Sequence, residues 1–256
     1  MPSDLFDLTN RTALITGSSG GLGLGIARGL AEAGASIVLN GRDMAKLAAV
    51  AAPLRAAGLK VSVSAFDVAD EKQVVAAFEA FDADQIAIDI LVNNAGVTLR
   101  KPMLQLQTDE WRRVIETNLT AAFIVGREAA RRMIARGNGG KIVNIVSLAS
   151  EVARATIAPY TSAKGGLKML TRSMAAEWAR HDIQANGIGP GYIEPEMTEA
   201  LRADPKFDAW VKSRTPSARW GKPDDLIGAT VFLASRASDY VNGQIIYVDG
   251  GLLAVI

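Results

Sequence analysis

The sequence predicts a doubly wound α/β sandwich, in which a seven-stranded parallel sheet carries helices on both faces within a single domain over residues 1–256. Three observations predict this fold. Short apolar runs alternate with longer amphipathic stretches along the whole chain. Most of these runs are continuously apolar, as is typical of strands buried on both faces. A glycine-rich turn follows the first run directly.

The apolar runs are expected to form the strands, and right-handed crossovers bring such strands into one parallel sheet. The stretches between them are long enough for the crossover helices that parallel strands require. In chain order the runs are Ala13–Thr16, Ser36–Asn40, Val61–Phe66, Ile88–Asn93, Lys141–Ser147, Ile183–Gly189 and Gln244–Val248.

Capping residues indicate where helices begin. Asp43 is expected to be the N-cap of a helix that starts at Met44. A long helical pattern covers residues 108–136 and ends before a glycine, and Pro223 lies in the first turn of another helix. The chain contains no internal repeat and no low-complexity tract.

The composition narrows the classes of function. The chain has a formal net charge of +1 and no long basic run, so a nucleic-acid surface is not expected. It has no cysteine and one histidine, His181, which argues against a metal site and a Ser-His-Asp triad. No apolar stretch approaches the roughly 18 residues of a membrane span, and the N-terminus does not resemble a signal peptide. We expect a cytoplasmic protein acting on a small molecule.

The glycine-rich turn has the context of a nucleotide site, because Thr16–Gly23 directly follows a predicted strand and opens a predicted helix. Glycines allow close approach of the backbone, and the N–H groups and dipole of the helix start favour a pyrophosphate. A glycine turn without a ligand is the alternative. The expected contacts are Gly17, Ser19, Gly21, Leu22 and Gly23.

The end of the second predicted strand decides the type of dinucleotide. A carboxylate there would accept from the ribose hydroxyls of NAD, whereas an arginine offers a fork to the 2′-phosphate of NADP. Asn40, Gly41 and Arg42 occupy this place, so NADP is favoured over NAD. Two alternatives remain open: Asp43 acting as the ribose acid, and Arg42 having no phosphate partner.

A second chemical signal lies in the middle of the chain. Tyr160 and Lys164 stand four residues apart, and Ser147 lies upstream at the end of an apolar run. On a helix the two side chains share a face, so the ammonium is expected to lower the phenol pKa by roughly 1–3 units. The phenol would then exchange a proton near neutral pH. A half-buried helix face without catalytic function is the alternative.

These motifs together resemble the short-chain dehydrogenase/reductase family over essentially the whole chain. The family's T-G-x-x-x-G-x-G turn matches Thr16–Gly23, its N-N-A-G matches residues 93–96, and its Ser with Y-x-x-x-K matches Ser147, Tyr160 and Lys164. Asn118 matches the family's helix asparagine. The resemblance implies a Rossmann fold and hydride exchange with a nicotinamide. Tyr160 would be the acid/base, Ser147 would donate to the substrate oxygen, Lys164 would hold the ribose, and Asn118 would position a water relay.

The resemblance also implies further cofactor contacts. The alternatives are an acidic cap for Asp67, a tight turn for residues 93–96 and a loop turn at Pro190. Two departures stand out: Pro195 replaces a threonine that relatives often have, and Gly20 replaces a basic residue that users of NADP often have. The implied contacts are Asp67 and Val68 at the adenine, Asn94, Ala95 and Gly96 beside the adenine ribose, Tyr160 and Lys164 at the catalytic helix, and Pro190, Gly191 and Ile193 over the nicotinamide.

Several shorter segments, among them residues 38–42, 150–154 and 214–221, resemble a branch of the family that interconverts D-gluconate and 5-dehydro-D-gluconate. Other ketones, such as a 3-oxoacyl thioester or a xenobiotic ketone, and a non-catalytic NADP-binding scaffold are the alternatives. The family resemblance implies a homotetramer with the apolar C-terminus packed between subunits, and a substrate lid is expected around residues 191–215. Arginine matches a carboxylate with a fork, and the expected substrate contacts are Arg100, Ser147, Glu151, Arg154, Tyr160 and Tyr192.

Overall fold

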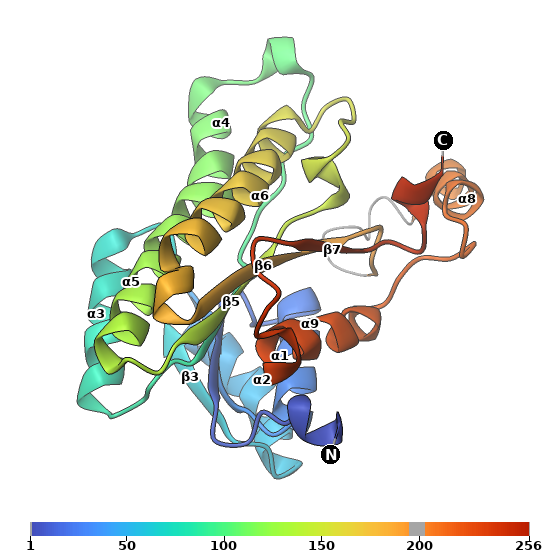
Figure 1. Ribbon diagram of the computed structural model, residues 1–256. Helices are drawn as coiled ribbons and strands as arrows, with labels where there is room; N and C mark the ends of the chain where they lie inside the picture. The colour runs from blue at the N-terminus through green and yellow to red at the C-terminus, as the bar shows by residue number, and fades with distance from the viewer. Residues whose placement is uncertain (1, 195–202, 256) are drawn as a thin grey trace.

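The computed structural model describes residues 2–194 and 203–255. A seven-stranded sheet forms its centre, in the order β3-β2-β1-β4-β5-β6-β7, and every neighbouring pair is parallel (Figure 1). The strand order reverses between β1 and β4, which is where open α/β sheets bind ligands at their carboxyl ends. The strands are β1 Thr12–Ile15, β2 Ser36–Gly41, β3 Val61–Ala65, β4 Ile90–Asn93, β5 Gly140–Ile145, β6 Ile183–Pro190 and β7 Ile245–Val248.

Helices cover both faces of the sheet. One hydrophobic cluster joins the sheet to α1, α2 and α9, and the other joins it to α3, α5 and α6, so the two clusters lie on opposite faces. No helix in the described ranges is long and apolar enough to cross a membrane. The helices are α1 Gly21–Glu32, α2 Met44–Ala56, α3 Glu71–Ala83, α4 Thr108–Ile115, α5 Ala121–Arg136, α6 Ala158–Trp178, α8 Pro205–Arg214 and α9 Ile227–Ala234.

The predicted fold class and all seven predicted strands are confirmed, with boundaries shifted by one or two residues. Asp43 is the N-cap of α2, because its Oδ1 accepts from the backbone N–H groups of Ala45 at 2.9 Å and Lys46 at 3.1 Å. Residues 108–136 are helical throughout, as predicted, although not as a single α-helix. A π turn, Glu116–Thr120, separates α4 from α5. Such turns are rare and are frequently found at functional sites.

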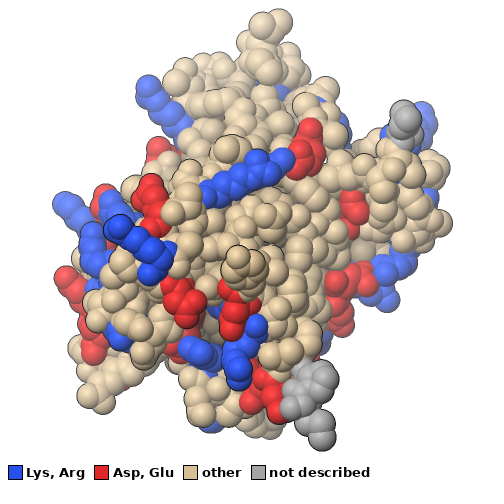
Figure 2. All heavy atoms as spheres, viewed as in Figure 1, with Lys and Arg blue, Asp and Glu red and all other residues tan. Residues whose placement is uncertain are grey.

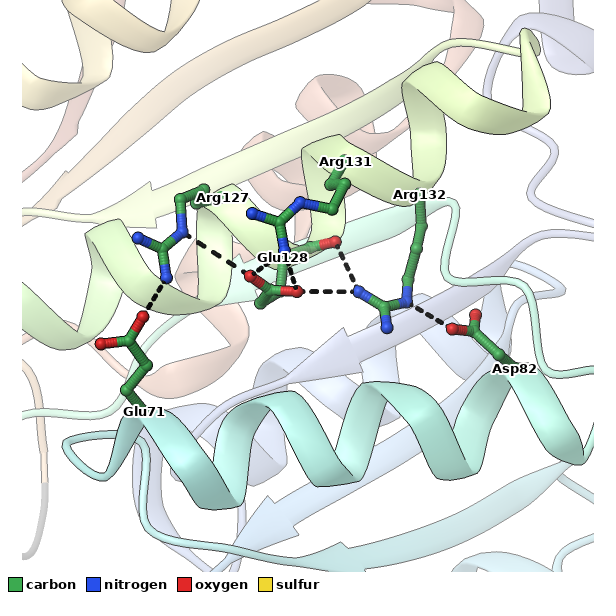
Figure 3. A network of polar contacts seen from close by, with 6 residues as sticks. All are labelled: Glu71, Asp82, Arg127, Glu128, Arg131 and Arg132. Atoms are coloured by element: carbon green, nitrogen blue, oxygen red, sulfur yellow. Dashed lines mark hydrogen bonds and ion pairs between the residues drawn. The ribbon is translucent and has the colours of Figure 1, made fainter.

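A charged network joins α3 to α5 on one face of the sheet (Figure 3). The Glu128 side chain is 1% exposed and forms ion pairs with Arg131 at 2.8 Å and Arg132 at 2.9 Å. Arg132 also reaches Asp82 of α3 at 2.8 Å, and Arg127 pairs with Glu71. A buried carboxylate is tolerated only when it is paired, so this network fixes the packing of the two helices.

Charges of both signs are interspersed on the face of the molecule in Figure 2. Lysine and arginine side chains alternate there with aspartate and glutamate, and no broad basic area appears among the described residues on this face. A nucleic-acid surface would need clustered basic side chains. This face therefore offers no support for nucleic-acid binding.

Candidate active site

The glycine turn lies at the carboxyl end of β1 and packs tightly against the loop after β4. Gly17 has a φ of +62°, and a Cβ on it would lie 2.8 Å from the Cα of Ala95. A Cβ on Gly23 would lie 2.5 Å from Nδ2 of Asn94. Only glycine fits these places. Gly20 is the N-cap of α1 and offers no capping side chain, so the first N–H groups of the helix can receive an anion.

The loop after β4 supports the glycine turn. Oγ1 of Thr16 accepts from the backbone N–H groups of Asn94 and Ala95, each at 3.0 Å. Nδ2 of Asn94 donates to the carbonyl oxygens of Thr16 at 2.9 Å and Gly17 at 3.0 Å. The Asn94 side chain is therefore used to hold the turn, and its predicted contact with a cofactor falls to the backbone of residues 94–96.

The Asn40 side chain, at the end of β2, also holds the glycine turn. Its side chain is 1% exposed, accepts from the N–H of Gly17 at 3.3 Å and donates to the carbonyls of Ser64 at 3.2 Å and Phe66 at 3.1 Å. The two N–H groups of the Asn40 amide are thus both used by the scaffold. The predicted contact of Asn40 with the cofactor stays a prediction.

Arg42 follows β2 and extends into solvent, with 78% of its side chain exposed. Its Nη1 lies 4.0 Å from Oδ2 of Asp67, which follows β3. Oδ1 of Asp67 accepts from the N–H of Ala69 at 3.0 Å, and Val68 is buried among core side chains. Arg42 and Asp67 thus lie together beyond the carboxyl ends of β2 and β3. The Asp43 side chain instead caps α2.

Ser147, Tyr160 and Lys164 meet at the carboxyl end of β5. Ser147 caps a short 3-10 turn and accepts from the N–H of Ala149 at 3.1 Å. Tyr160 lies in the first turn of α6, and its hydroxyl is hydrogen-bonded to Ser147. Lys164 is 4% exposed, donates to the carbonyl of Ile145 at 2.6 Å and lies 5.6 Å from the centre of the Tyr160 ring. The sequence prediction that these three residues converge is confirmed.

The predicted direction of the Tyr160 pKa shift is wrong for the protein without ligands. Burial raises the pKa of Tyr160, and the hydrogen bond with Ser147 and the charge of Arg100 lower it by less. Burial also lowers the pKa of Lys164 to about 8. The prediction neglected desolvation, which disfavours the charged form of both groups at once.

Asn118 lies at the centre of the π turn. Its Nδ2 donates to the carbonyls of Val97 and Val114, each at 2.8 Å, and its Oδ1 accepts from the N–H of Val97 at 3.3 Å. A Cβ on Gly96 would lie 2.6 Å from the same oxygen. The Asn118 amide thus joins the loop after β4 to the π turn, so a water relay would have to use other atoms of this residue.

A cavity of about 430 Å³ opens beside the tyrosine. Ser147 and Tyr160 line it together with the predicted substrate contacts Arg100, Arg154 and Tyr192. The guanidinium of Arg154 lies 5.0 Å from the centre of the Phe207 ring. The remaining lining residues are Thr98, Leu148, Ala149, Val152, Ala153, Ile157, Gly191, Trp210, Arg214, Leu252, Leu253 and Val255.

Glu151 does not line this cavity, so its predicted contact with substrate is not supported. Its carboxylate accepts instead from Lys168 of α6 and from the hydroxyl of Tyr247 of β7. These contacts lower the pKa of Glu151. Burial and the hydrogen bond with Glu151 raise the pKa of Tyr247 to about 12. Glu151 thus anchors the loop between Ser147 and Tyr160 to the body of the fold.

The segment after β6 covers one side of the cavity. A Cβ on Gly191 would lie 2.7 Å from the Cα of Asp249, and Ile193 forms a parallel bridge with Gly221. The Tyr192 ring packs edge-on against the rings of Phe207 and Trp210 of α8, with centroids 5.6 and 5.8 Å away. Pro190 ends β6. Pro195 lies outside the described residues.

Several lining residues were not predicted as substrate contacts, among them Arg214, Trp210 and the C-terminal residues Leu252, Leu253 and Val255. Arg214 ends α8, whose N-cap is Asp204. The aromatic content of residues 207–220 is a signal that could have indicated packing against a site. The C-terminal residues line the cavity of their own chain beside α8 (Figure 1), and their packing between subunits stays a prediction.

Comparison with known proteins places the chain in a family. The sequence model of a family described as "Enoyl-(Acyl carrier protein) reductase" matches residues 17–253. The chain belongs to the short-chain dehydrogenase/reductase family. This confirms the resemblance drawn from Thr16–Gly23, residues 93–96, Ser147, Tyr160 and Lys164.

Relatives that match along their whole length act on sugar acids, by their names. The chain is 50% identical over 249 residues to a gluconate 5-dehydrogenase of Gluconobacter oxydans, covering 97% of both chains. It is 45% identical over 258 residues to a 2-dehydro-3-deoxy-D-gluconate 5-dehydrogenase of Formosa agariphila, covering 100% of this chain and 97% of the relative. A crystal structure of a gluconate 5-dehydrogenase from Burkholderia cenocepacia in complex with NADP and tartrate superposes with a TM-score of 0.97, at 52% identity and full coverage of both chains.

Proposed function

We propose that this protein is an NADP-dependent oxidoreductase that interconverts D-gluconate and 5-dehydro-D-gluconate. One observation carries the proposal: a single cavity joins the hydroxyls of Ser147 and Tyr160 to the guanidinium groups of Arg100 and Arg154. The hydroxyls suit a carbonyl or alcohol oxygen, and the guanidinium groups suit a carboxylate. A keto acid has both groups.

The cofactor proposal rests on the fit of the glycine turn. Gly17 and Gly23 let the turn pack closely against the loop after β4. Because α1 begins without a capping side chain, the first N–H groups of this helix suit a pyrophosphate. Arg42 would hold the 2′-phosphate of NADP, in agreement with the NADP in the Burkholderia cenocepacia relative. When bound, the nicotinamide supplies hydride transfer to or from the substrate carbon.

The protein's own residues would manage the proton. In reduction Tyr160 donates its hydroxyl proton to the ketone oxygen, and in oxidation it accepts the alcohol proton. Ser147 would hold the same substrate oxygen. An ammonium has three N–H donors, and one N–H of Lys164 is used by the Ile145 carbonyl, so the others are available to a ribose. We keep Asn118 as a positioning residue, because its amide joins two loops beside the site.

The names of the relatives support a six-carbon acid that reacts at carbon 5. Because one relative is named for 2-dehydro-3-deoxy-D-gluconate, this acid is the second candidate substrate. A 3-oxoacyl thioester or xenobiotic ketone would make less use of the cavity's arginines. A scaffold that binds NADP without turnover would have no need for the Ser147–Tyr160 hydrogen bond.

We also propose that the protein acts in the cytoplasm as a homotetramer, with residues 191–215 as a substrate lid. Trp210 and Arg214 of α8 support the lid, because they line the cavity from this segment. Light scattering tests the assembly, and a stable monomer would contradict it.

The oxidation of NADPH with 5-keto-D-gluconate tests the function. We expect turnover with this acid and little with a 3-oxoacyl thioester or an aryl ketone. Replacing NADPH with NADH is expected to raise the KM for the cofactor. Arg42→Ala is expected to raise the KM for NADPH while leaving that for NADH unchanged, and an equal effect on both would contradict the proposed role of Arg42.

A further inference from the structure

We propose that the site also reduces hydroxyl-free oxo acids whose ketone and carboxylate are separated as in 5-dehydro-D-gluconate, with 5-oxohexanoate as the parent compound. The inference rests on the proposed function. It states that the cavity selects its substrate by the spacing between ketone and carboxylate, and that the intervening hydroxyl groups contribute little.

The described walls of the cavity are largely apolar. Apart from the reacting hydroxyls and the arginines, most of the described lining is aliphatic or aromatic. Leu148 and Val152 come from the loop after β5, and Leu252 and Leu253 come from the C-terminus. Contact of such a surface with the methylene groups of a ligand is favourable, because it removes apolar area from water. The surface gains nothing comparable from a hydroxyl.

The described side chains of the cavity offer few hydrogen-bond acceptors for substrate hydroxyls. Each hydroxyl of a sugar acid carries a proton that needs an acceptor, and arginine has none. The described lining residues include no aspartate, glutamate, asparagine or glutamine, and Glu151 is held by Lys168 and Tyr247. The hydroxyls of Thr98 and Tyr192 are the side-chain acceptors that the described lining adds to Ser147 and Tyr160. The side chains of the described lining are thus rich in donors and poor in acceptors.

Arg100 and Arg154 form the part of the cavity that suits a carboxylate. Arg100 and Arg154 are close enough that the charge of Arg154, together with burial, lowers the pKa of Arg100. Arg154 is further held by its stacking on Phe207. Two neighbouring guanidinium groups favour an anion strongly, whereas a neutral ketone receives nothing from them. We therefore expect the cavity to bind a carboxylate at its arginines and an apolar chain along its other walls.

The chemical step with 5-oxohexanoate is the same as with 5-dehydro-D-gluconate. The ketone carbon of 5-oxohexanoate gains a hydride from the reduced nicotinamide, and the ketone oxygen gains the Tyr160 proton. The C=O π bond is replaced by C–H and O–H bonds. The acid is reduced to 5-hydroxyhexanoate, and NADPH is oxidised to NADP⁺.

Three compounds test the inference: 5-keto-D-gluconate, 5-oxohexanoate, and 2-hexanone, which has a methyl in place of the carboxylate. A site that reads substrate hydroxyls rejects an analogue lacking them by about 10⁴–10⁵-fold, whereas an apolar pocket discriminates by about 10–200-fold. We expect kcat/KM for 5-oxohexanoate to lie within about 200-fold of that for 5-keto-D-gluconate. We expect 2-hexanone to be at least tenfold worse than 5-oxohexanoate.

Calorimetry gives a second readout that needs no turnover. Titration of 5-oxohexanoate into the protein with NADP⁺ is expected to show binding that Arg154→Gln weakens, while Arg112→Gln, on the exposed surface of α4, leaves it unchanged. A loss of 10⁴-fold or more with 5-oxohexanoate, in an enzyme active on 5-keto-D-gluconate, would overturn the inference and leave the proposed function standing. Equal activity on 2-hexanone would overturn the role of the carboxylate. Activity on 5-oxohexanoate without activity on 5-keto-D-gluconate would overturn both the inference and the proposed function, because the hydroxyl groups would then decide which acid reacts. Inactivity on both acids would also overturn both.

Discussion

The Arg154 guanidinium stacks on the Phe207 ring, 5.0 Å from its centre, and so joins the loop that follows Ser147 to helix α8. A cation over an aromatic ring gains about 0.5–1 kcal/mol at a partly exposed site. Loss of the ring would leave Arg154 free to adopt other rotamers.

We therefore expect Phe207→Leu to raise the KM for the acid substrate about two- to fivefold with kcat nearly unchanged. Phe123→Leu is the matched control, because Phe123 lies under Arg127 at 5.1 Å and does not line the cavity. Steady-state kinetics of both variants decide the matter. An unchanged KM in Phe207→Leu would show that the stacking does not position Arg154.

Arg100 links substrate binding to the proton on Tyr160. Its charge lowers the pKa of Tyr160, against the larger effect of burial. Removing that charge disfavours the phenolate, so Arg100→Gln is expected to move the alkaline rise of kcat/KM for alcohol oxidation to higher pH. The KM for the acid should rise in the same variant. Arg112→Gln serves as control, and an identical pH profile in Arg100→Gln would refute the coupling.

Burial of Lys164 makes the stability of the protein without ligands depend on pH. Its pKa falls from 10.5 to about 8 on folding, so the unfolded chain binds more protons between these values. The free energy of unfolding should therefore rise with pH from about 8 to 10.5 through this group, by up to about 3 kcal/mol. Below pH 8 the full cost of burying the charge is present.

Lys164→Met removes this contribution, and it also leaves the Ile145 carbonyl without its donor at a cost of about 1–3 kcal/mol. We expect little net change in stability at pH 7, but the difference between wild type and variant should grow in favour of wild type as pH rises to 10.5. Urea unfolding at several pH values measures it. A difference independent of pH would contradict the predicted pKa.

Glu128 is expected to stabilise the fold rather than the reaction. It is 1% exposed among three arginines, and removal of one partner from a buried ion pair costs about 3–5 kcal/mol. Glu128→Ala should lower the free energy of unfolding by this amount, with Glu177→Ala on the exposed surface of α6 as control. A loss below about 1 kcal/mol would mean that the arginines find other partners.

Much of the fold followed from the sequence because its signals are local. Apolar runs indicated the strands, and Asp43 indicated the start of α2. The π turn at Asn118 was not predicted, since one extra residue in a helical turn hardly changes the spacing of apolar side chains. The bonds of the Asn40 side chain to the scaffold were not predicted, because a polar residue at a strand end looks the same in sequence whether it faces a ligand or the scaffold.

The candidate site depended more on tertiary structure. Ser147, Tyr160 and Lys164 converge as predicted, but the shift of the Tyr160 pKa reversed because burial is a property of the whole fold. Arg214 reaches the cavity from a distant part of the sequence. The Glu151 carboxylate accepts hydrogen bonds from Lys168 and Tyr247, two partners that the sequence does not reveal, and it does not line the cavity.

The most direct test of the central claim, that the Tyr160 hydroxyl supplies the proton, is the turnover of Tyr160→Phe with NADPH and 5-keto-D-gluconate. The ring remains and only the hydroxyl is lost, so NADPH binding, followed by tryptophan fluorescence, should be retained. We expect turnover to fall at least about 100-fold, as for loss of a positioned acid. Turnover equal to that of the wild type would contradict the account.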